Sequence, residues 1–520
     1  MIASVGIDLG RTGRHQVRAL DEGARPCDSF TFQHTLQGME MLEERIFRDG
    51  ANPVIVFEPT GLAWLPIAIY LKARHPGCRL VRAKLQKVAA LRRYLRGGAK
   101  SDRIDGLTLA KMPFIDAEHL DEVYLPSSEL HALQRLTRQR ERLERSITAR
   151  KNRIGSIVDG FLVGLRESFD DSWSRPARAL LSHHLNPFAV ARDTAGRLAA
   201  LLKEADDRDR GVKAEALRVH QVCRQLVALY QRCATAGMVD EEFFEHLQEE
   251  VACELRLMEA EEAEKERIAK RIAELYTCLH PEDHLRTIPG VGEHTAQIFL
   301  AMVGEAKRFR SQKAFGNWSG VVPGARQSSN IEGKGLRMTK AGPAMMKRAL
   351  YQAGNIGRRF DPQLASVYYR QMVEHGKTHH QAMGAVMSHL SARILSVLRE
   401  GRPYQLRDVH GNPVTPAEAL GIIRACYTVP QELRRQRRQR NPEPRRRHDA
   451  QQAMANDGET VSATTHEAAT APQRGRSTVP QTVVYGVSRP GATSPRKEHA
   501  TSPSVSTRIR MLPKGGRSLI

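Results

Sequence analysis

Cysteine is scarce in this sequence of 520 residues, and long apolar runs are missing from it. The seven cysteines form no CxxC pair and no zinc-type spacing with histidine, so neither a disulfide framework nor a structural metal site is indicated. No stretch approaches the roughly 18–20 consecutive apolar residues that a membrane span needs, and the N-terminus lacks the basic and then apolar order of a signal peptide. These absences predict a cytoplasmic protein with no membrane partner.

Acidic residues are outnumbered in this chain. Lys and Arg total 80 against 58 Asp and Glu, which leaves a formal charge of +22. The segment 431–520 alone holds 17 basic and 7 acidic residues, so the body of the protein is only moderately basic. Such an excess favours a large polyanion as partner. At the usual ~100–200 residues per domain, the length predicts about three domains and excludes a small disulfide scaffold.

Residues 1–125 alternate strand and helix patterns, which is typical of an α/β domain. Three strand-like segments joined by short turns predict an antiparallel meander that leads into a parallel part. Residues 126–280 contain two long amphipathic helices, expected at 128–159 and 240–276. These helices fit either a globular bundle or a coiled coil that mediates self-association, because neither repeat clearly sustains four heptads.

A third region, residues 281–405, is mainly helical in pattern and begins with LRTIPGVGEHTAQ. This segment looks like a helix-hairpin-helix, in which Gly290 and Gly292 let backbone N–H groups hold a phosphate of a nucleic acid. The alternative is a helical hairpin that needs glycine only for its turn. A connecting segment, 406–430, leads to a basic tail, 431–520, whose arginine-rich and then Ser/Thr/Pro/Ala-rich composition predicts disorder.

Four carboxylates follow the expected strands and helices of the first domain. Asp8 ends the strand VGID, and Glu58 ends the strand VIVFE. Asp102 and Asp105 lie three residues apart, which puts both on one helix face. Such a cluster favours Mg²⁺ or Mn²⁺, which prefer carboxylate oxygen, and two-metal phosphodiester chemistry would use it. Taken singly, each acid is more often a turn, cap or surface residue.

Two further segments carry chemistry. IDLGRTG resembles the first phosphate loop of an actin/Hsp70-like sugar kinase or ATPase. No second Asp-x-Gly-x-Thr/Ser loop follows, and this disfavours an ATP site. Residues 315–355 contain a Gly/Ser-rich loop in which the hydroxyl of Ser328 or Ser329 can attack a phosphodiester and form a covalent intermediate, if nearby cations or metals lower the barrier. A serine in a loop is more commonly a turn residue that only makes hydrogen bonds.

Together these segments resemble the insertion-sequence-110 family of DEDD transposases, also known as bridge-RNA-guided recombinases, over about residues 1–405. The resemblance implies an N-terminal domain with a RuvC-like, ribonuclease H-type fold. It also implies a mainly helical C-terminal transposase domain with a P-x-x-x-Q-S-G-type loop, which Pro323, Gln327 and Ser328 match. Ser329 stands where the family usually has glycine, and it is the second-choice nucleophile. The implied site residues are the catalytic and metal-binding Asp8, Glu58, Asp102 and Asp105, the nucleophile Ser328, and the nucleic-acid-binding Gly290, Gly292, Lys340, Lys347 and Arg348.

The implied function is excision and insertion of an insertion sequence in double-stranded DNA by Mg²⁺- or Mn²⁺-dependent, serine-mediated strand exchange. By the same resemblance, a non-coding guide RNA selects the sites, the enzyme is a dimer or tetramer, and it associates with the nucleoid. One subunit's acidic centre is then completed by the serine domain of another. Two alternatives stay open: a RuvC-like structure-specific endonuclease, and a catalytically silent nucleic-acid-binding protein.

Overall fold

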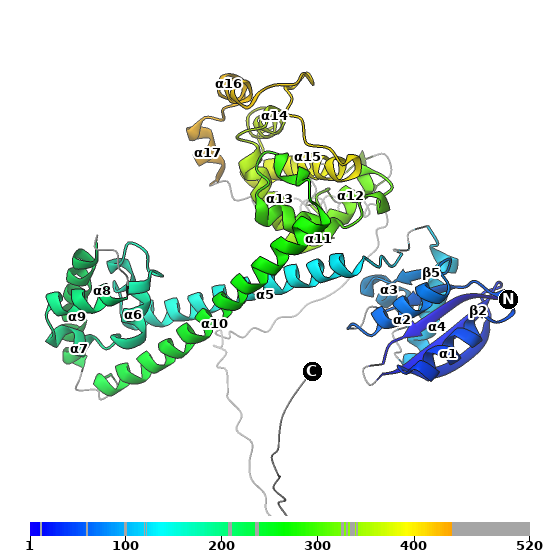
Figure 1. The fold of residues 1–520 in the computed structure, drawn as a ribbon, viewed down its shortest axis with the longest axis horizontal. Helices are drawn as coiled ribbons and strands as arrows, with labels where there is room; N and C mark the ends of the chain where they lie inside the picture. Colours follow the sequence, from blue (N-terminus) through cyan, green and yellow to red (C-terminus); the bar gives the residue numbers. More distant parts are fainter. Residues whose placement is uncertain are drawn as a thin grey trace, which may run out of the picture. The chain divides into compact units, whose positions relative to one another are not determined.

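A computed structural model describes most of residues 1–438, which belong to the compact unit Met1–Asn441. The described residues exclude 11–12, 59–60, 98–100, 119, 121, 206–210, 234–238, 324–326, 329–330, 333–337, 340–341 and everything from 439 onward. The unit is mixed α/β, with one N-terminal sheet followed by mostly helical structure, as the sequence patterns predict (Figure 1). No helix in the described part of the chain is long and apolar enough to cross a membrane.

The N-terminal sheet has five strands in the order β3-β2-β1-β4-β5. β1 pairs antiparallel with β2, and β2 with β3, whereas β1–β4 and β4–β5 are parallel. The predicted meander leading into a parallel part is therefore confirmed. The strands are β1 (Ile2–Asp8), β2 (Arg14–Asp21), β3 (Pro26–Gln33), β4 (Val54–Phe57) and β5 (Arg79–Arg82).

Helices cover both faces of this sheet. Side chains alternate between the faces along a strand, and in β4 the buried Ile55 and Phe57 pack in one apolar cluster while Val56 packs in another. Leu42 and Ile67 belong to the first cluster, so their helices cover that face, and the helices after β5 cover the other. The helices are α1 (Leu36–Ile46), α2 (Trp64–Arg74), α3 (Leu85–Arg96) and α4 (Asp102–Ile115), with a 3-10 turn at Arg48–Gly50.

The two long helices exist and pack against each other within the chain (Figure 1). They are α5 (Ser128–Phe161) and α10 (Glu241–Leu279). Leu133 of α5 shares a cluster with Leu275 of α10, and Val158 shares another with Phe244, so the pair is antiparallel. Self-association through these helices stays a prediction. Between them in sequence come a 3-10 turn (Arg166–Ser168) and the helices α6 (Arg175–His183), α7 (Pro187–Arg192), α8 (Ala195–Glu204) and α9 (Val212–Cys233).

The C-terminal region is helical around one small hairpin. Its apolar core joins α11, α13 and α15 to the beginning of α5 and the end of α10. The elements are α11 (Glu293–Val303), α12 (Gln312–Ser319), β6 (Gln327–Ser328), β7 (Ile331–Glu332), α13 (Ala344–Gly357), α14 (Pro362–Tyr369), a π-helical turn (Arg370–Glu374), α15 (His379–Glu400), α16 (Pro416–Cys426) and α17 (Gln431–Arg438), with 3-10 turns at His284–Thr287 and Ala306–Arg308.

Two expectations need correction. The element just before the IPGVG turn is a single 3-10 turn, His284–Thr287, where an α-helix was expected.

The prediction of disorder from residue 431 onward is wrong for the first eight residues, which form α17. This helix is held because Leu433 packs against the cluster that contains Val429, and because Arg437 donates to the carbonyl oxygen of Met372. The remainder of the predicted disordered tail lies outside the described residues.

Candidate active site

Asp8 and Glu58 lie at the ends of two neighbouring parallel strands. Ile7 of β1 is in register with Phe57 of β4, and the two acids are the next residues along each strand. Neighbouring strands lie ~4.8 Å apart, so the two carboxylates leave the same edge of the sheet next to each other. Ile7 and Phe57 belong to the cluster beneath α1 and α2. By alternation, the two half-buried acids point to the opposite face, which α3 and α4 cover.

Helix α4 lies directly on β1 because both elements have glycine where they cross. A Cβ atom on Gly6 would lie 2.1 Å from the carbonyl oxygen of Gly106, so only hydrogen atoms fit between the two backbones. The Ser4 hydroxyl donates to the carbonyl oxygen of Ala110 at 2.7 Å and fixes the helix along the strand. Asp105, the neighbour of Gly106, is thereby brought to the sheet, where it is only 4% exposed.

Arg92 of α3 is a member of this site that the sequence patterns do not reveal. Its Nη1 atom lies 2.7 Å from Oδ1 of Asp105, and its side chain is 21% exposed. The hydrogen bond to Asp105 raises the pKa of Arg92, and the charge of Glu58 raises it further. A guanidinium therefore neutralises part of the acidic edge. No motif could have found it, because the α3–α4 contact is tertiary and Arg92 is one of several basic residues on its helix.

The convergence of all four carboxylates stays a prediction. Asp102 is the first residue of α4, capped by Ser101, but its side chain lies outside the described residues. Among the described side chains, no group of three His, Cys, Asp or Glu is close enough to hold a metal ion. The four predicted ligands nevertheless have the chemistry that a hard divalent cation prefers, because all of them are carboxylates. One of them, Asp105, already pairs with a cationic group, the guanidinium of Arg92.

Ser328 is the last residue of β6, opposite Ile331 of β7 in a small antiparallel hairpin. The hairpin lies within a segment whose ends are tied together, since Pro323 bridges to Met338 and Thr339 N–H donates to the Val322 carbonyl at 3.0 Å. The Ser328 side chain and all of Ser329 and Lys340 lie outside the described residues. Their proposed roles therefore stay predictions.

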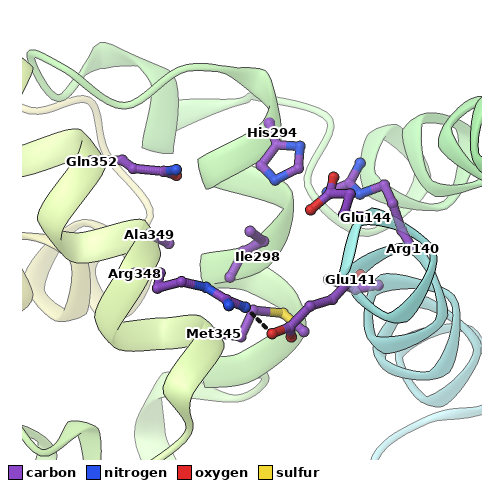
Figure 2. Close-up of a pocket in the computed structure, with 10 residues that line it drawn as sticks. Arg140, Glu141, Glu144, His294, Ile298, Met345, Arg348, Ala349 and Gln352 are labelled. Carbon is purple, nitrogen blue, oxygen red and sulfur yellow. Dashed lines mark ion pairs between the residues drawn. The ribbon is translucent and has the colours of Figure 1, made fainter. Parts of the chain in front are cut away.

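Arg348, a predicted nucleic-acid contact on α13, already has an acidic partner. Its guanidinium forms an ion pair with Glu141 of α5, across a polar pocket between α5, α11 and α13 (Figure 2). Glu141 also pairs with Arg145. A phosphate that approached Arg348 would have to compete with Glu141 for the guanidinium. Lys347, the neighbouring candidate, is half-buried.

The two glycines of the IPGVG turn differ in their surroundings. Gly290 has a φ of +87°, and a Cβ atom there would lie 2.3 Å from the carbonyl oxygen of Ala353 and 2.4 Å from the amide nitrogen of Gly357. Packing of the turn onto α13 is therefore sufficient to require Gly290. Gly292 is exposed at the beginning of α11, with open space around its Cβ position. Of the pair, Gly292 is the one available to a nucleic acid.

Replacing Gly290 by Ala is expected to destabilise the C-terminal region by about 2–6 kcal/mol, since the backbone strain and the overpacking each cost roughly 1–3 kcal/mol. Gly292→Ala is the matched control and is expected to cost under about 1 kcal/mol, because alanine is only a poorer N-cap there. Thermal unfolding followed by calorimetry measures both changes. Equal losses of stability in the two variants would contradict the packing role of Gly290.

Comparison with known proteins gives two family matches. A family model for IS110-type DEDD sequences, described as transposase, matches residues 5–163, which include Asp8, Glu58, Asp102 and Asp105. A second model, described as transposase of the IS116/IS110/IS902 family, matches residues 282–369, which include the IPGVG turn and Ser328. The two matches thus cover both halves of the candidate site.

Individual relatives agree with these matches. The IS110 insertion element of Streptomyces coelicolor encodes an uncharacterized 43.6 kDa protein that is 23% identical over 411 residues, covering 78% of this chain and 95% of the relative. An uncharacterized 42 kDa protein of the IS900 element of Mycobacterium paratuberculosis is 27% identical over 241 residues, or 46% of this chain and 55% of the relative. The pilin gene-inverting protein of Moraxella bovis is 27% identical over 141 residues, or 26% of this chain and 44% of the relative.

Proposed function

The chain belongs to the IS116/IS110/IS902 family of transposases and is a DNA transposase or recombinase, and from this premise we propose that it excises and inserts an insertion sequence by metal-dependent, serine-mediated strand exchange. One Moraxella relative is named for inverting a pilin gene, which is a rearrangement of DNA and supports the proposal. The substrate is double-stranded DNA, at the ends of the element and at its target.

The observation that carries the proposal is that Asp8 and Glu58 leave one sheet edge side by side, on the face where α4 brings the buried Asp105 to the sheet. The sheet order and the helices on both faces support a RuvC-like, ribonuclease H-type fold. We propose that these three acids and Asp102 hold Mg²⁺ or Mn²⁺. When bound, the metal would stabilise negative charge on the oxygens of a phosphodiester during displacement. Arg92 would balance part of the negative charge of Asp105 and Glu58.

Ser328 is the proposed nucleophile. Its Oγ attacks the phosphorus of a DNA phosphodiester, a new Oγ–P bond forms, and the bond from phosphorus to the leaving sugar oxygen breaks. The serine proton passes to solvent or a nearby base, and the sugar oxygen leaves as a hydroxyl group. A hydroxyl of the exchanged strand then attacks the same phosphorus and releases Ser328. The bond energy is conserved, so the strands rejoin without another energy source.

Guide RNA and assembly complete the proposal. We propose that a non-coding RNA selects the donor and target sites, and that the acidic centre of one subunit works with the serine segment of another in a dimer or tetramer. The resemblance to the family is the support for both statements, together with the net charge of +22, which suits a second polyanion.

RNA that co-purifies with the protein from cells carrying the native element, once sequenced, should map to the flank of the gene.

The direct test is incubation of the purified protein, Mg²⁺ and RNA from the element with DNA that contains the element ends and target. Strand exchange predicts rejoined junctions between donor and target. A structure-specific endonuclease would give cut strands without new junctions. A silent binding protein would give neither product.

Replacing Arg92 by Gln is expected to tighten binding of Mn²⁺ to the DNA-free protein by about tenfold, because removal of a positive charge beside Asp105 lessens repulsion of the metal. Arg93→Gln is the matched control, since it removes the same charge from an exposed neighbouring position. Isothermal titration with Mn²⁺ measures both affinities. Equal affinities in the two variants would show that Arg92 does not oppose the metal.

A further inference from the structure

The cations of α5 fall into two groups. In the second half of the helix, Arg150, Lys151 and Arg153 are matched by acids of α10. Arg150 pairs with Glu254 at 2.7 Å and with Glu261 at 3.0 Å, and Arg153 pairs with Glu254 at 3.3 Å. This half of the helix therefore has its charge compensated within the chain.

The first half of α5 carries a basic stripe, made of His131, Arg135, Arg138 and Arg142. Steps of four, three and four residues put all four within roughly 60° of one another around a helix of 3.6 residues per turn. The three arginines are exposed, and none of the four has an ion-pair partner among the residues that the structure describes. The stripe faces away from the buried side of the helix, where Leu133 lies.

The residues of the basic stripe repel one another because they carry like charges. Neighbouring atoms partly desolvate the exposed guanidinium of Arg138 and lower its pKa, and the charges of Arg82, Arg135 and Arg142 lower it further. Burial also lowers the pKa of His131, as do the charges of Arg135 and Arg138. Neither shift has an acid among its main causes. An external anion would relieve this repulsion, and several cations along a helix suit a polyanion better than a small ion.

Arg82 links the stripe to the acidic edge. It ends β5, in register with Phe57 of the neighbouring parallel strand, and Glu58 follows Phe57. Its guanidinium lies over the ring of Trp64, 5.4 Å from the centroid. The end of β5 also lies close to the beginning of α5. Val123 N–H donates to the carbonyl oxygen of Leu80 in β5 at 2.8 Å, and α5 begins soon after, at Ser128. The positive surface thus reaches the same edge of the sheet as the carboxylates, on the face that α2 covers.

We propose that the basic stripe binds the sugar-phosphate backbone of a DNA duplex and leads it to the sheet edge that carries Asp8 and Glu58. The stripe spans about 16 Å at 1.5 Å per residue. A duplex presents roughly ten phosphate charges over that length, at one per ~1.7 Å, so charge complementarity is strong and independent of base sequence. This inference rests on the proposed function in one respect: DNA is taken to be the substrate of the site that carries the carboxylates.

The test compares two triple variants with equal loss of charge. One is Arg135→Gln, Arg138→Gln and Arg142→Gln; glutamine is a good helix former, so α5 should persist. The control is Arg224→Gln, Arg232→Gln and Arg256→Gln, which changes exposed arginines of α9 and α10 that also lack an ion-pair partner among the described residues. Circular dichroism and thermal unfolding verify the folding of both.

Binding of a labelled DNA duplex is measured by fluorescence anisotropy over a series of salt concentrations, with divalent metal chelated. The stripe variant is expected to bind more than about tenfold more weakly, with a slope of log affinity against log salt that is smaller by about 2–3, since each phosphate contact contributes ~0.9. The control is expected to change affinity by less than about threefold, because distant exposed charges are screened.

Three results would overturn the proposal: an equal loss in the control, a loss confined to double-stranded RNA of the same sequence, or a changed oligomeric state with DNA affinity intact. The Asp8→Asn variant separates this proposal from the proposed function. If Asp8→Asn keeps strand exchange while the stripe variant loses DNA binding, the proposed site is wrong and the stripe stands. If Asp8→Asn loses exchange while the stripe variant binds DNA normally, the stripe is wrong and the site stands.

Discussion

Replacing Asp105 by Asn is expected to lower strand exchange at least about a hundredfold, because a negative charge that would hold the metal is lost from the acidic edge. The change removes one charge and keeps the shape of the side chain. Asp105 is only 4% exposed and contacts Arg92, so the loss of this partner should also destabilise the fold modestly. The Arg92 side chain is partly accessible and can turn to solvent, which limits that cost. Exchange is measured as the rate at which rejoined junctions appear.

Asp116→Asn is the matched control for this prediction. Asp116 caps α4 and pairs with Lys87 of α3 at 3.1 Å, so it also joins these two helices, but it lies at the opposite end of α4 from Asp102. It should lose little stability and keep exchange near the wild-type rate, since exposed ion pairs contribute little. Near-normal exchange in Asp105→Asn, with its fold intact, would remove Asp105 from the site.

Replacing Ser328 by Ala is expected to lower strand exchange at least about a thousandfold, because no other hydroxyl then lies at that position to form the covalent intermediate. The substitution deletes a single oxygen atom. Ser328 ends a two-residue strand in a small hairpin, so the fold should be almost unaffected. Junction formation and thermal unfolding are measured on the same preparations.

Ser329→Ala is the control for Ser328 and should keep exchange. If Ser329→Ala is inactive while Ser328→Ala stays active, the nucleophile is one residue further along the loop. If both serine variants still cut DNA while Asp102→Asn does not, and no variant yields rejoined junctions, the acidic edge acts by hydrolysis, and the protein is a structure-specific endonuclease. Each pattern therefore identifies a different chemistry.

Much of the sheet could be predicted because its central strands are short, mostly apolar runs that alternate along the chain with helix patterns. The strand IASVGID and the apolar run PVIVFE predicted the positions of Asp8 and Glu58, and the parallel register of Ile7 with Phe57 brings the two acids to one edge. The local spacing of Asp102 and Asp105 likewise predicted a helix, which α4 confirms. These features depend on residues that are close in sequence.

Features that depend on tertiary contacts could not be predicted. Arg92 reaches Asp105 only because α3 and α4 pack together, and Arg348 meets Glu141 only because α13 lies against α5. The arginine-rich composition after residue 430 predicted disorder, yet α17 forms because Leu433 finds an apolar surface. In this last case tertiary packing overrides local composition.

The most direct test of the central claim is detection of a covalent protein–DNA adduct. Wild-type protein reacts with labelled DNA that contains the element end, in the presence of Mg²⁺ and RNA from the element, and the products are separated under denaturing conditions. A serine recombinase predicts labelled protein from wild type, with the modified residue mapped to Ser328 by mass spectrometry, and no adduct from Ser328→Ala or Asp102→Asn. Rejoined DNA junctions without any adduct, or an adduct that persists in Ser328→Ala, would contradict this account.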